Sequence, residues 1–313
     1  MLARAPSSGE ACMSANPSLA RRTAPDALHR ALLAAFALLL PVILVQGART
    51  DAVAQGLAGV SITILTLHAV ALLGPAWTAT FAGICLSVTF AIENVGVATG
   101  VPFGRYVFLV GSDLPRIGTI PLIVGPLYFG IGYPAWIIAS LLVGSDAARP
   151  RDRLSLFVVP VVAAFTITQW DLVMDPSNAT IGRAWLWFDG GGYFGVPLSN
   201  FLGWFLTTWT FFQLFALVAY LSPDRDRSRS RDPVFLALPI LTYMATGLCH
   251  LMPLLDPDMP VIDGGGRSWS SADIRETAAL VALLTMLPTS CLALIRLVQS
   301  RAPSSVPSGT SSS

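Results

Sequence analysis

Residues 52–92 read AVAQGLAGVSITILTLHAVALLGPAWTATFAGICLSVTFAI, a run of 41 residues without a single Asp, Glu, Lys or Arg. A helix rises about 1.5 Å per residue, so one helix of this length would be roughly twice as long as the ~30 Å hydrocarbon core of a bilayer is thick. Gly74-Pro75, near the middle, combines a helix-ending residue with a helix-starting one. The stretch therefore predicts two membrane-spanning helices joined by a tight turn at Gly74-Pro75.

The whole chain has the composition of a polytopic membrane protein. Of its 313 residues, 54% are hydrophobic and 12% are charged, about half the ~25% charged share of soluble domains. Every basic residue is arginine, and the formal net charge of +1 argues against nucleic acid as a partner. We expect an all-α transmembrane bundle of about eight spans, with seven as the alternative count, and no soluble domain.

Intervals between charged residues give the expected spans. They lie at 31–45, twice within 52–92, within 117–145, and at 154–174, 200–221, 233–252 and 277–295. Pro121, Pro126 and Pro134, with the glycines between them, predict that the fourth span is kinked or broken and surrounded by protein. The apolar run after Arg21-Arg22 imitates a signal peptide, but the further spans favour an uncleaved first helix.

The ends and the orientation follow from polar segments. We expect a disordered tail at 1–27, one integral membrane domain at 28–299 and a second disordered tail at 300–313. Arginines are concentrated on the N-terminal side of the bundle, in the segments 4–30, 149–153, 225–231 and 296–301. The positive-inside rule then predicts a multi-pass protein of the inner membrane with both termini in the cytoplasm.

Polar side chains gather at the opposite ends of several spans. Asp171 and Asp175 are four residues apart near the end of the fifth span, so a helix shows both on one face. The same depth holds Glu93, Asn94, Asn200 and His250. Acids inside a membrane are costly and therefore predict a functional site. The alternative is that Asp175-Pro176 only marks the end of a helix.

Two loops on this side, 99–106 and 185–195, are rich in aromatic residues and glycine. Such loops form either an aromatic belt at the headgroup level or a lid over the mouth of an apolar pocket.

Other polar residues have structural explanations. We expect His68 to be a hydrogen-bonded core histidine, and Asp273 with Glu276 fits an N-cap and capping box of the eighth span. The glycine runs after Asp189 and Asp263 lack the strand and lysine of a phosphate-binding loop. The four cysteines show no CxxC spacing, and the acidic layer lacks the His-rich spacing of a di-iron oxygenase. We therefore expect neither a disulfide nor a metal.

Three motifs, ENVGVATGVPFGRY at 93–106, WDLVMDP at 170–176 and YFGVPLSNFLGW at 193–204, resemble the membrane carotenoid-biosynthesis proteins that include the carotenoid 1',2'-hydratases and the bisanhydrobacterioruberin hydratase. The likeness covers about spans three to eight. It implies addition of water to the C1'=C2' double bond of an acyclic ψ end group, without a cofactor. It also implies that the substrate is lycopene, γ-carotene or a C50 precursor. The expected partners of the protein are the lipid bilayer and other carotenoid-pathway enzymes.

This chemistry needs a proton donor, a tolerated tertiary cation and a positioned water. We expect Asp171 to donate the proton, Asp175 and Glu93 to act as base or as acid-tuning partners, Asn200 to hold water, and Arg105 to pair with one carboxylate. Aromatic faces can stabilise the cation. The residues expected to bind substrate are Asn94, Arg105, Tyr106, Trp170, Trp185, Trp187, Tyr193, Asn200, Trp204 and His250.

Two other functional classes fit part of the pattern. A proton-coupled or lipid- or isoprenoid-binding transporter also carries acids inside the membrane, although the two halves show no repeat and the acids lie near one interface. Another isoprenoid enzyme, a cyclase or a prenyltransferase, is the third possibility. Prenyltransferases use Asp-rich motifs that bind magnesium diphosphate, of which Asp171 and Asp175 are a weak approximation.

Overall fold

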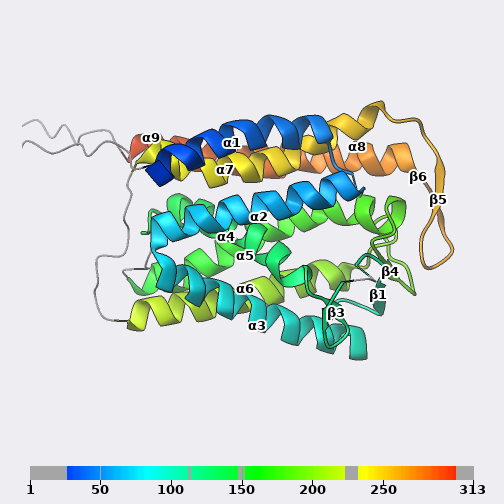
Figure 1. Ribbon diagram of the computed structural model, residues 1–313. Helices are drawn as coiled ribbons and strands as arrows, with labels where there is room; N and C mark the ends of the chain where they lie inside the picture. The colour runs from blue at the N-terminus through cyan, green and yellow to red at the C-terminus, as the bar shows by residue number, and fades with distance from the viewer. Residues whose placement is uncertain are drawn as a thin grey trace, which may run out of the picture.

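The computed structural model describes residues 27–49, 51–111, 114–146, 150, 152–222 and 232–300, which form a helical bundle (Figure 1). The helices are α1 (Ala27–Gln46), α2 (Ala52–Leu73), α3 (Pro75–Thr99), α4 (Val124–Val143), α5 (Arg153–Pro176), α6 (Leu198–Leu221), α7 (Pro233–Leu248), α8 (Ser271–Val281) and α9 (Leu287–Gln299). Short π or 3-10 segments extend them, namely η1 (Ser177–Ile181), η2 (Cys249–Leu255) and η3 (Ala282–Met286). Eight helical segments are long and apolar enough to cross a membrane, which confirms the predicted fold class.

The beginning of α1 and the end of α9 lie at the same end of the bundle (Figure 1). Apart from Ala27 and Ser300, the predicted tails at 1–27 and 300–313 lie outside the described residues, as do the arginines at 149, 151 and 225–231. The cytoplasmic placement of both termini stays a prediction.

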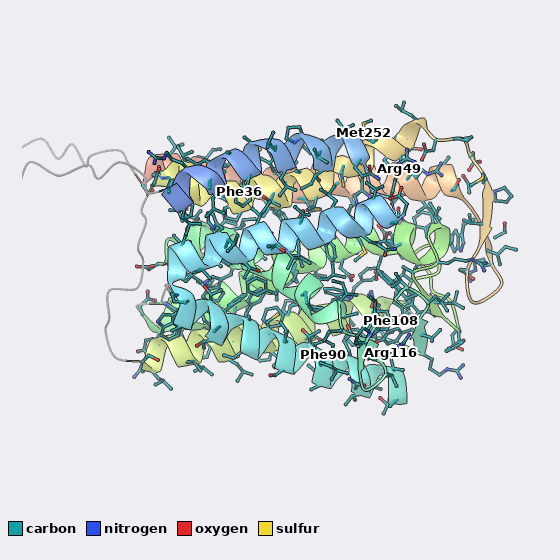
Figure 2. The ribbon with its side chains drawn as sticks, viewed as in Figure 1. Phe36, Arg49, Phe90, Phe108, Arg116 and Met252 are labelled. Atoms are coloured by element: carbon teal, nitrogen blue, oxygen red, sulfur yellow. The ribbon has the colours of Figure 1, made fainter. Side chains whose placement is uncertain are left out.

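Short antiparallel ribbons lie at the opposite end of the bundle (Figure 1). The pairs are β1 (Tyr106–Phe108) with β4 (Trp185–Trp187), β2 (Arg116–Ile117) with β3 (Ile120–Pro121), and β5 (Pro260–Ile262) with β6 (Ser268–Ser270). Figure 2 labels Phe108 and Arg116 at this end, which we call the strand end.

The predicted turn between the second and third spans is confirmed. Gly74 has a φ of 87°, a conformation that favours glycine, and its N–H bonds the carbonyl of Val70 at 3.0 Å. Pro75 follows as the first residue of α3, a position where its missing N–H costs nothing.

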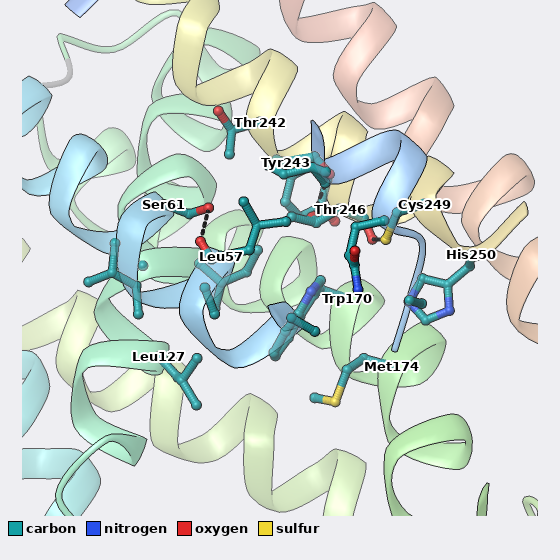
Figure 3. Close-up of a pocket in the computed structure, with 18 of the residues that line it drawn as sticks. Leu57, Ser61, Leu127, Trp170, Met174, Thr242, Tyr243, Thr246, Cys249 and His250 are labelled. Carbon is teal, nitrogen blue, oxygen red and sulfur yellow. Dashed lines mark hydrogen bonds between the residues drawn. The ribbon is translucent and has the colours of Figure 1, made fainter. Parts of the chain in front are cut away.

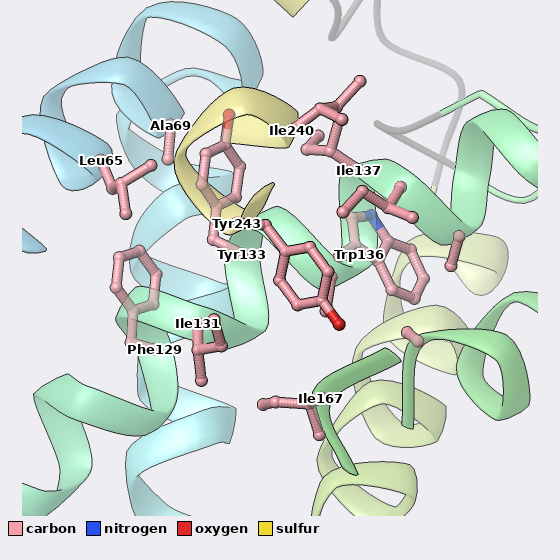
Figure 4. Packing of buried hydrophobic residues seen from close by; sticks show 14 of the residues in the cluster. Leu65, Ala69, Phe129, Ile131, Tyr133, Trp136, Ile137, Ile167, Ile240 and Tyr243 are labelled. Atoms are coloured by element: carbon pink, nitrogen blue, oxygen red, sulfur yellow. The ribbon is translucent and has the colours of Figure 1, made fainter. Parts of the chain in front are cut away.

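Helix α4 lies at the centre of the bundle. In its most apolar window 72% of residues are buried, against 22–56% in the other spans. Figure 4 shows Tyr133 and Trp136 of this helix packed with side chains from α2, α5 and α7. The predicted enclosure by protein is confirmed, but of the two predicted shapes, kinked or broken, the break is wrong, because α4 is one continuous helix that contains Pro134. Its glycines serve close packing, since a Cβ at Gly125 would lie 2.6 Å from Phe90.

His68 is confirmed as a hydrogen-bonded core histidine. Its Nε2 lies 2.9 Å from the carbonyl oxygen of Phe235, and its Nδ1 lies 2.8 Å from the hydroxyl of Tyr133. That carbonyl lacks its usual helical donor, because residue 239, four positions on, is a proline. Since a carbonyl only accepts, Nε2 carries the hydrogen and Tyr133 donates to Nδ1.

The start of the eighth span corrects one prediction. The N-cap is Ser270, not Asp273, because Ser270 is extended and its hydroxyl oxygen accepts the N–H of Asp273 at 3.1 Å. Asp273 therefore lies in the first turn of α8, where its charge favours the helix dipole.

Candidate active site

Helix α5 carries the two aspartates and does not end beside them. It is α-helical to Pro176 and continues as η1 to Ile181. The interpretation of Asp175-Pro176 as a helix end is therefore wrong. Asp171 is fully buried and Asp175 is 1% exposed, so both carboxyl groups project from a continuous helix into the bundle.

Tyr193 supports this helix at its proline. Pro176 has no amide hydrogen for the carbonyl of Leu172, and the hydroxyl of Tyr193 donates to that oxygen at 3.1 Å. Burial, followed by the charges of Asp171 and Asp175, raises the pKa of Tyr193 to about 12, so the hydroxyl remains a donor at neutral pH. The structure thus places the hydroxyl of Tyr193, a predicted substrate-binding residue, against the backbone of α5.

Asn200, in the first turn of α6, joins the two carboxyl groups. Its Nδ2 donates to Oδ2 of Asp171 at 3.1 Å and to Oδ2 of Asp175 at 2.5 Å. Asp171 Oδ1 is buried and accepts no hydrogen bond from the described residues. Within that part of the chain neither aspartate has a salt bridge. Two carboxyl groups thus share one neutral donor in an apolar interior.

Glu93 of α3 is held by two phenols. It is 4% exposed and accepts hydrogen bonds from the hydroxyls of Tyr106 on β1 and of Tyr128 on α4, the latter at 2.7 Å. Burial and then the charge of Glu93 raise the pKa of Tyr106, which keeps that hydroxyl protonated. Glu93 is also close enough to Asp171 and Asp175 to interact with them electrostatically.

These groups surround a cavity of about 80 Å³, which we call the acid cavity. Its polar lining includes Glu93, Asp175 and Asn200, whereas Asp171 is not part of the lining. The remaining lining residues are mostly aromatic or aliphatic, namely Phe103, Tyr106, Phe108, Val110, Ile123, Val124, Leu127, Tyr128, Trp170, Met174, Trp185, Trp187 and Trp204. Asp175 is therefore the member of the aspartate pair that faces the cavity.

Aromatic rings pack closely around the acid cavity. Tyr128 stacks on Trp204 with ring centroids 4.2 Å apart and planes 7° apart. Trp170 meets Trp204 edge to face at 5.9 Å. A small group bound beside Asp175 would therefore lie against aromatic faces.

The β1–β4 ribbon closes the acid cavity at the strand end. Tyr106 is paired with Trp187 across the ribbon, and Phe108 is paired with Trp185. The Trp187 indole N–H donates to the carbonyl of Phe103 at 3.0 Å, and Trp185 lines the acid cavity together with Asp175. The two aromatic loops thus form a wall over the carboxyl groups, which supports the lid interpretation.

Arg105 does not pair with any of the three buried acids, and that prediction is wrong. Its guanidinium forms an ion pair with Asp189, with Nε 2.9 Å from Oδ2, and both side chains are more than half exposed. The hydrogen bond from Arg105 lowers the pKa of Asp189. The pair ties the two loops together outside the acid cavity.

Two other predicted site residues share the membrane depth of the acids but lie elsewhere. The Asn94 amide N–H donates to the carbonyls of Phe90 and Ile117, and its oxygen accepts the N–H of Thr119, so it fixes the β2–β3 turn. His250 lines a second cavity.

This second cavity, of about 220 Å³, lies between α1, α2, α4, α5 and α7 (Figure 3). We call it the long cavity. Leu127, Trp170 and Met174 line both cavities, and Figure 3 shows them together on one side of the long cavity.

Sequence reasoning missed Tyr128 and the apolar residues Phe103, Phe108, Leu127 and Met174. Tyr128 had one available signal, since it is a hydroxyl-bearing residue in the apolar fourth span, which was expected to be enclosed by protein. Among the described residues, no group of three or more His, Cys, Asp or Glu side chains is arranged to hold a metal ion.

Comparison with known proteins indicates where this chain belongs. The sequence model of a family described as carotenoid biosynthesis protein matches residues 51–258. Over 119 residues the chain is 31% identical to the bisanhydrobacterioruberin hydratase of Haloarcula japonica, a match that spans 38% of each chain. No solved structure matches. The region matched by the family includes every residue of the acid cavity.

Proposed function

Because this chain belongs to the carotenoid biosynthesis protein family, we propose that it is a carotenoid hydratase, which adds water to the C1'=C2' double bond of an acyclic ψ end group. The product would be a tertiary 1'-hydroxy carotenoid. The proposal rests mainly on the buried pair of Asp171 and Asp175, bridged by Asn200 and open to an aromatic cavity through Asp175. The name of the relative supplies the reaction class.

Proton transfer from Asp175 to C2' begins the reaction. The π electrons form the new C–H bond and leave a tertiary cation at C1'. Burial and mutual repulsion favour an aspartate pair that shares one proton. We assign the transfer to Asp175, because it lines the acid cavity, and Asp171 becomes the partner that shares the proton. This changes the sequence-based hypothesis, in which Asp171 was the donor.

The cation at C1' would be stabilised by aromatic faces and by Glu93. Trp170, Tyr128 and Trp204 all line the cavity, and a desolvated cation–π contact contributes about 2 kcal/mol. The carboxylate of Glu93, held by two phenols, adds negative charge close to the site of the cation.

Water then captures the cation. A site needs about 15 Å³ to admit one water molecule, so a cavity of about 80 Å³ has room for water beside a small hydrocarbon group. The Asn200 side-chain oxygen would hold the water, whose lone pair forms the C1'–O bond. Glu93 accepts the proton that the bound water releases. Glu93 then releases this proton to solvent and the aspartate pair regains one, so one molecule of water is consumed, both acids return to their starting state and no redox change occurs.

An acid-initiated carotenoid cyclase is the second candidate. Its first step would be the same protonation, and the aromatic cavity would stabilise the same cation, which a double bond of the substrate then captures. Cyclisation leaves the mass of the carotenoid unchanged. A proton-coupled or isoprenoid-binding transporter would leave the carotenoid itself unchanged.

Expression in hosts that make lycopene, γ-carotene or a C50 precursor tests the proposal. Mass spectrometry of the pigments should find a product heavier by one water, and growth in water labelled with heavy oxygen should label the new hydroxyl. A product of unchanged mass but altered absorbance would indicate a cyclase. An unchanged pigment profile with all three substrates would contradict an enzymatic role of this kind.

A further inference from the structure

Two neighbouring side-chain stripes of α5 face different surroundings. Asp171 and Asp175 face Asn200, while Trp170, Met174 and Asn178 in η1, displaced by one residue, line the long cavity. Residues four apart share a helix face. Helix α5 therefore presents Asp175 to the acid cavity, while the adjacent stripe forms one side of the long cavity.

The long cavity is elongated along the helices. Its lining on α2 runs from Ala54 to Leu65, which is about 16 Å at the helical rise and roughly half of the ~30 Å hydrocarbon core. Small side chains, including Ala54, Ala58 and Ser61, leave this space open. The shape suits an extended chain better than a compact ligand.

The lining is chemically apolar along most of this length. The hydroxyls of Ser61, Thr242 and Thr246 donate to carbonyls of their own helices, so these donors are already occupied by the backbone. Gln46, Arg49 and Asn178 lie towards the strand end. The part that reaches Leu65 offers mainly hydrocarbon contacts, which favour an apolar ligand.

Three side chains separate the long cavity from the acid cavity, because Leu127, Trp170 and Met174 belong to both linings. A methionine is flexible and repacks easily. We propose that the long cavity binds the hydrocarbon chain of a long acyclic isoprenoid, and that its end group passes between Leu127, Trp170 and Met174 to reach Asp175. The choice of substrate rests on the proposed function, whereas the binding of a long hydrocarbon chain can be measured without catalysis.

Pigment retention tests this assignment directly. The full chain, purified in lipid nanodiscs, is loaded with lycopene and separated by gel filtration, and bound lycopene per protein is measured by absorbance. Ala58→Phe fills the long cavity, whereas Ala52→Phe adds the same ring on an exposed part of the same helix. We expect about tenfold less lycopene bound to Ala58→Phe, a loss of about 1.4 kcal/mol in binding, because the ring occupies the space of the hydrocarbon chain, and unchanged retention by Ala52→Phe.

If Ala58→Phe does not elute as a folded protein, Ala54→Phe, which also fills the long cavity, replaces it, and the same loss of bound lycopene is expected. Equal retention by the wild type and by the folded cavity-filling variants would overturn the inference. Loss of retention in those variants, together with unhydrated pigment in the wild type, would support the binding cavity and contradict the hydratase.

Discussion

The hydroxyl of Tyr193 donates a 3.1 Å hydrogen bond to the carbonyl oxygen of Leu172, which Pro176 leaves without its helical partner. Leu172 lies next to Asp171, so this bond supports the helix at the candidate catalytic pair. The tyrosine in the loop between α5 and α6 thus compensates for the proline in the helical segment that carries the aspartates.

A double-mutant cycle tests this relationship. Tyr193→Phe leaves the Leu172 carbonyl unpaired and should destabilise the protein by about 1–2 kcal/mol. In a Pro176→Ala background residue 176 regains an amide hydrogen, so Tyr193→Phe should cost much less. Thermal unfolding in detergent measures both differences. Equal effects of Tyr193→Phe in the two backgrounds would show that the tyrosine acts in some other way.

Glycine packing around Phe103 gives a second prediction. A Cβ at Gly96 of α3 would lie 2.6 Å from the ring of Phe103, whereas a Cβ at Gly83 of the same helix has no neighbour within 4 Å. Gly96→Ala should therefore lower the unfolding temperature, with a cost of about 1–3 kcal/mol from overpacking. Gly83→Ala should raise it slightly, because alanine favours helix by about 1 kcal/mol. The prediction fails if the two variants unfold at the same temperature.

The phenols that hold Glu93 give a third prediction. Tyr128→Phe removes one hydrogen bond to the carboxylate, and bonds to charged groups contribute about 1.5–3 kcal/mol. Hydration per folded protein should fall by about tenfold or more. Tyr133→Phe on the same helix removes a hydroxyl that bonds His68, outside the acid cavity, and should leave that rate within about twofold. Equal rates in the two variants would show that the phenol does not act on catalysis.

Much of the fold followed from residue chemistry. The charge-free run 52–92 and Gly74-Pro75 fixed two spans and their turn, and the same counting gave eight spans. Predictions of helix ends and breaks failed where tertiary contacts stabilise a helix that contains proline. Pro176 reads as a helix end, yet the hydroxyl of Tyr193 takes over for the missing amide. Pro134 reads as a break, yet the buried α4 remains continuous.

The sequence predicted the membrane depth of the candidate site residues, but not the side of each helix on which their side chains lie. Shared depth grouped Glu93 and Asn200 correctly with the aspartate pair. It also grouped Asn94 and His250, which point to a turn and to the long cavity, because depth along a helix says nothing about rotation around its axis. Tyr128 escaped notice, since only packing shows that its hydroxyl reaches Glu93.

The amount of hydrated carotenoid that Asp175→Asn forms shows whether Asp175 delivers the proton. The substitution keeps the shape of the side chain but removes the acid. The hydrated product, measured by mass spectrometry in a lycopene-producing host and normalised to membrane abundance, should fall at least about 100-fold. Asp189→Asn, an exposed carboxyl outside the acid cavity, should retain activity. Hydration by Asp175→Asn at the wild-type rate would contradict this account.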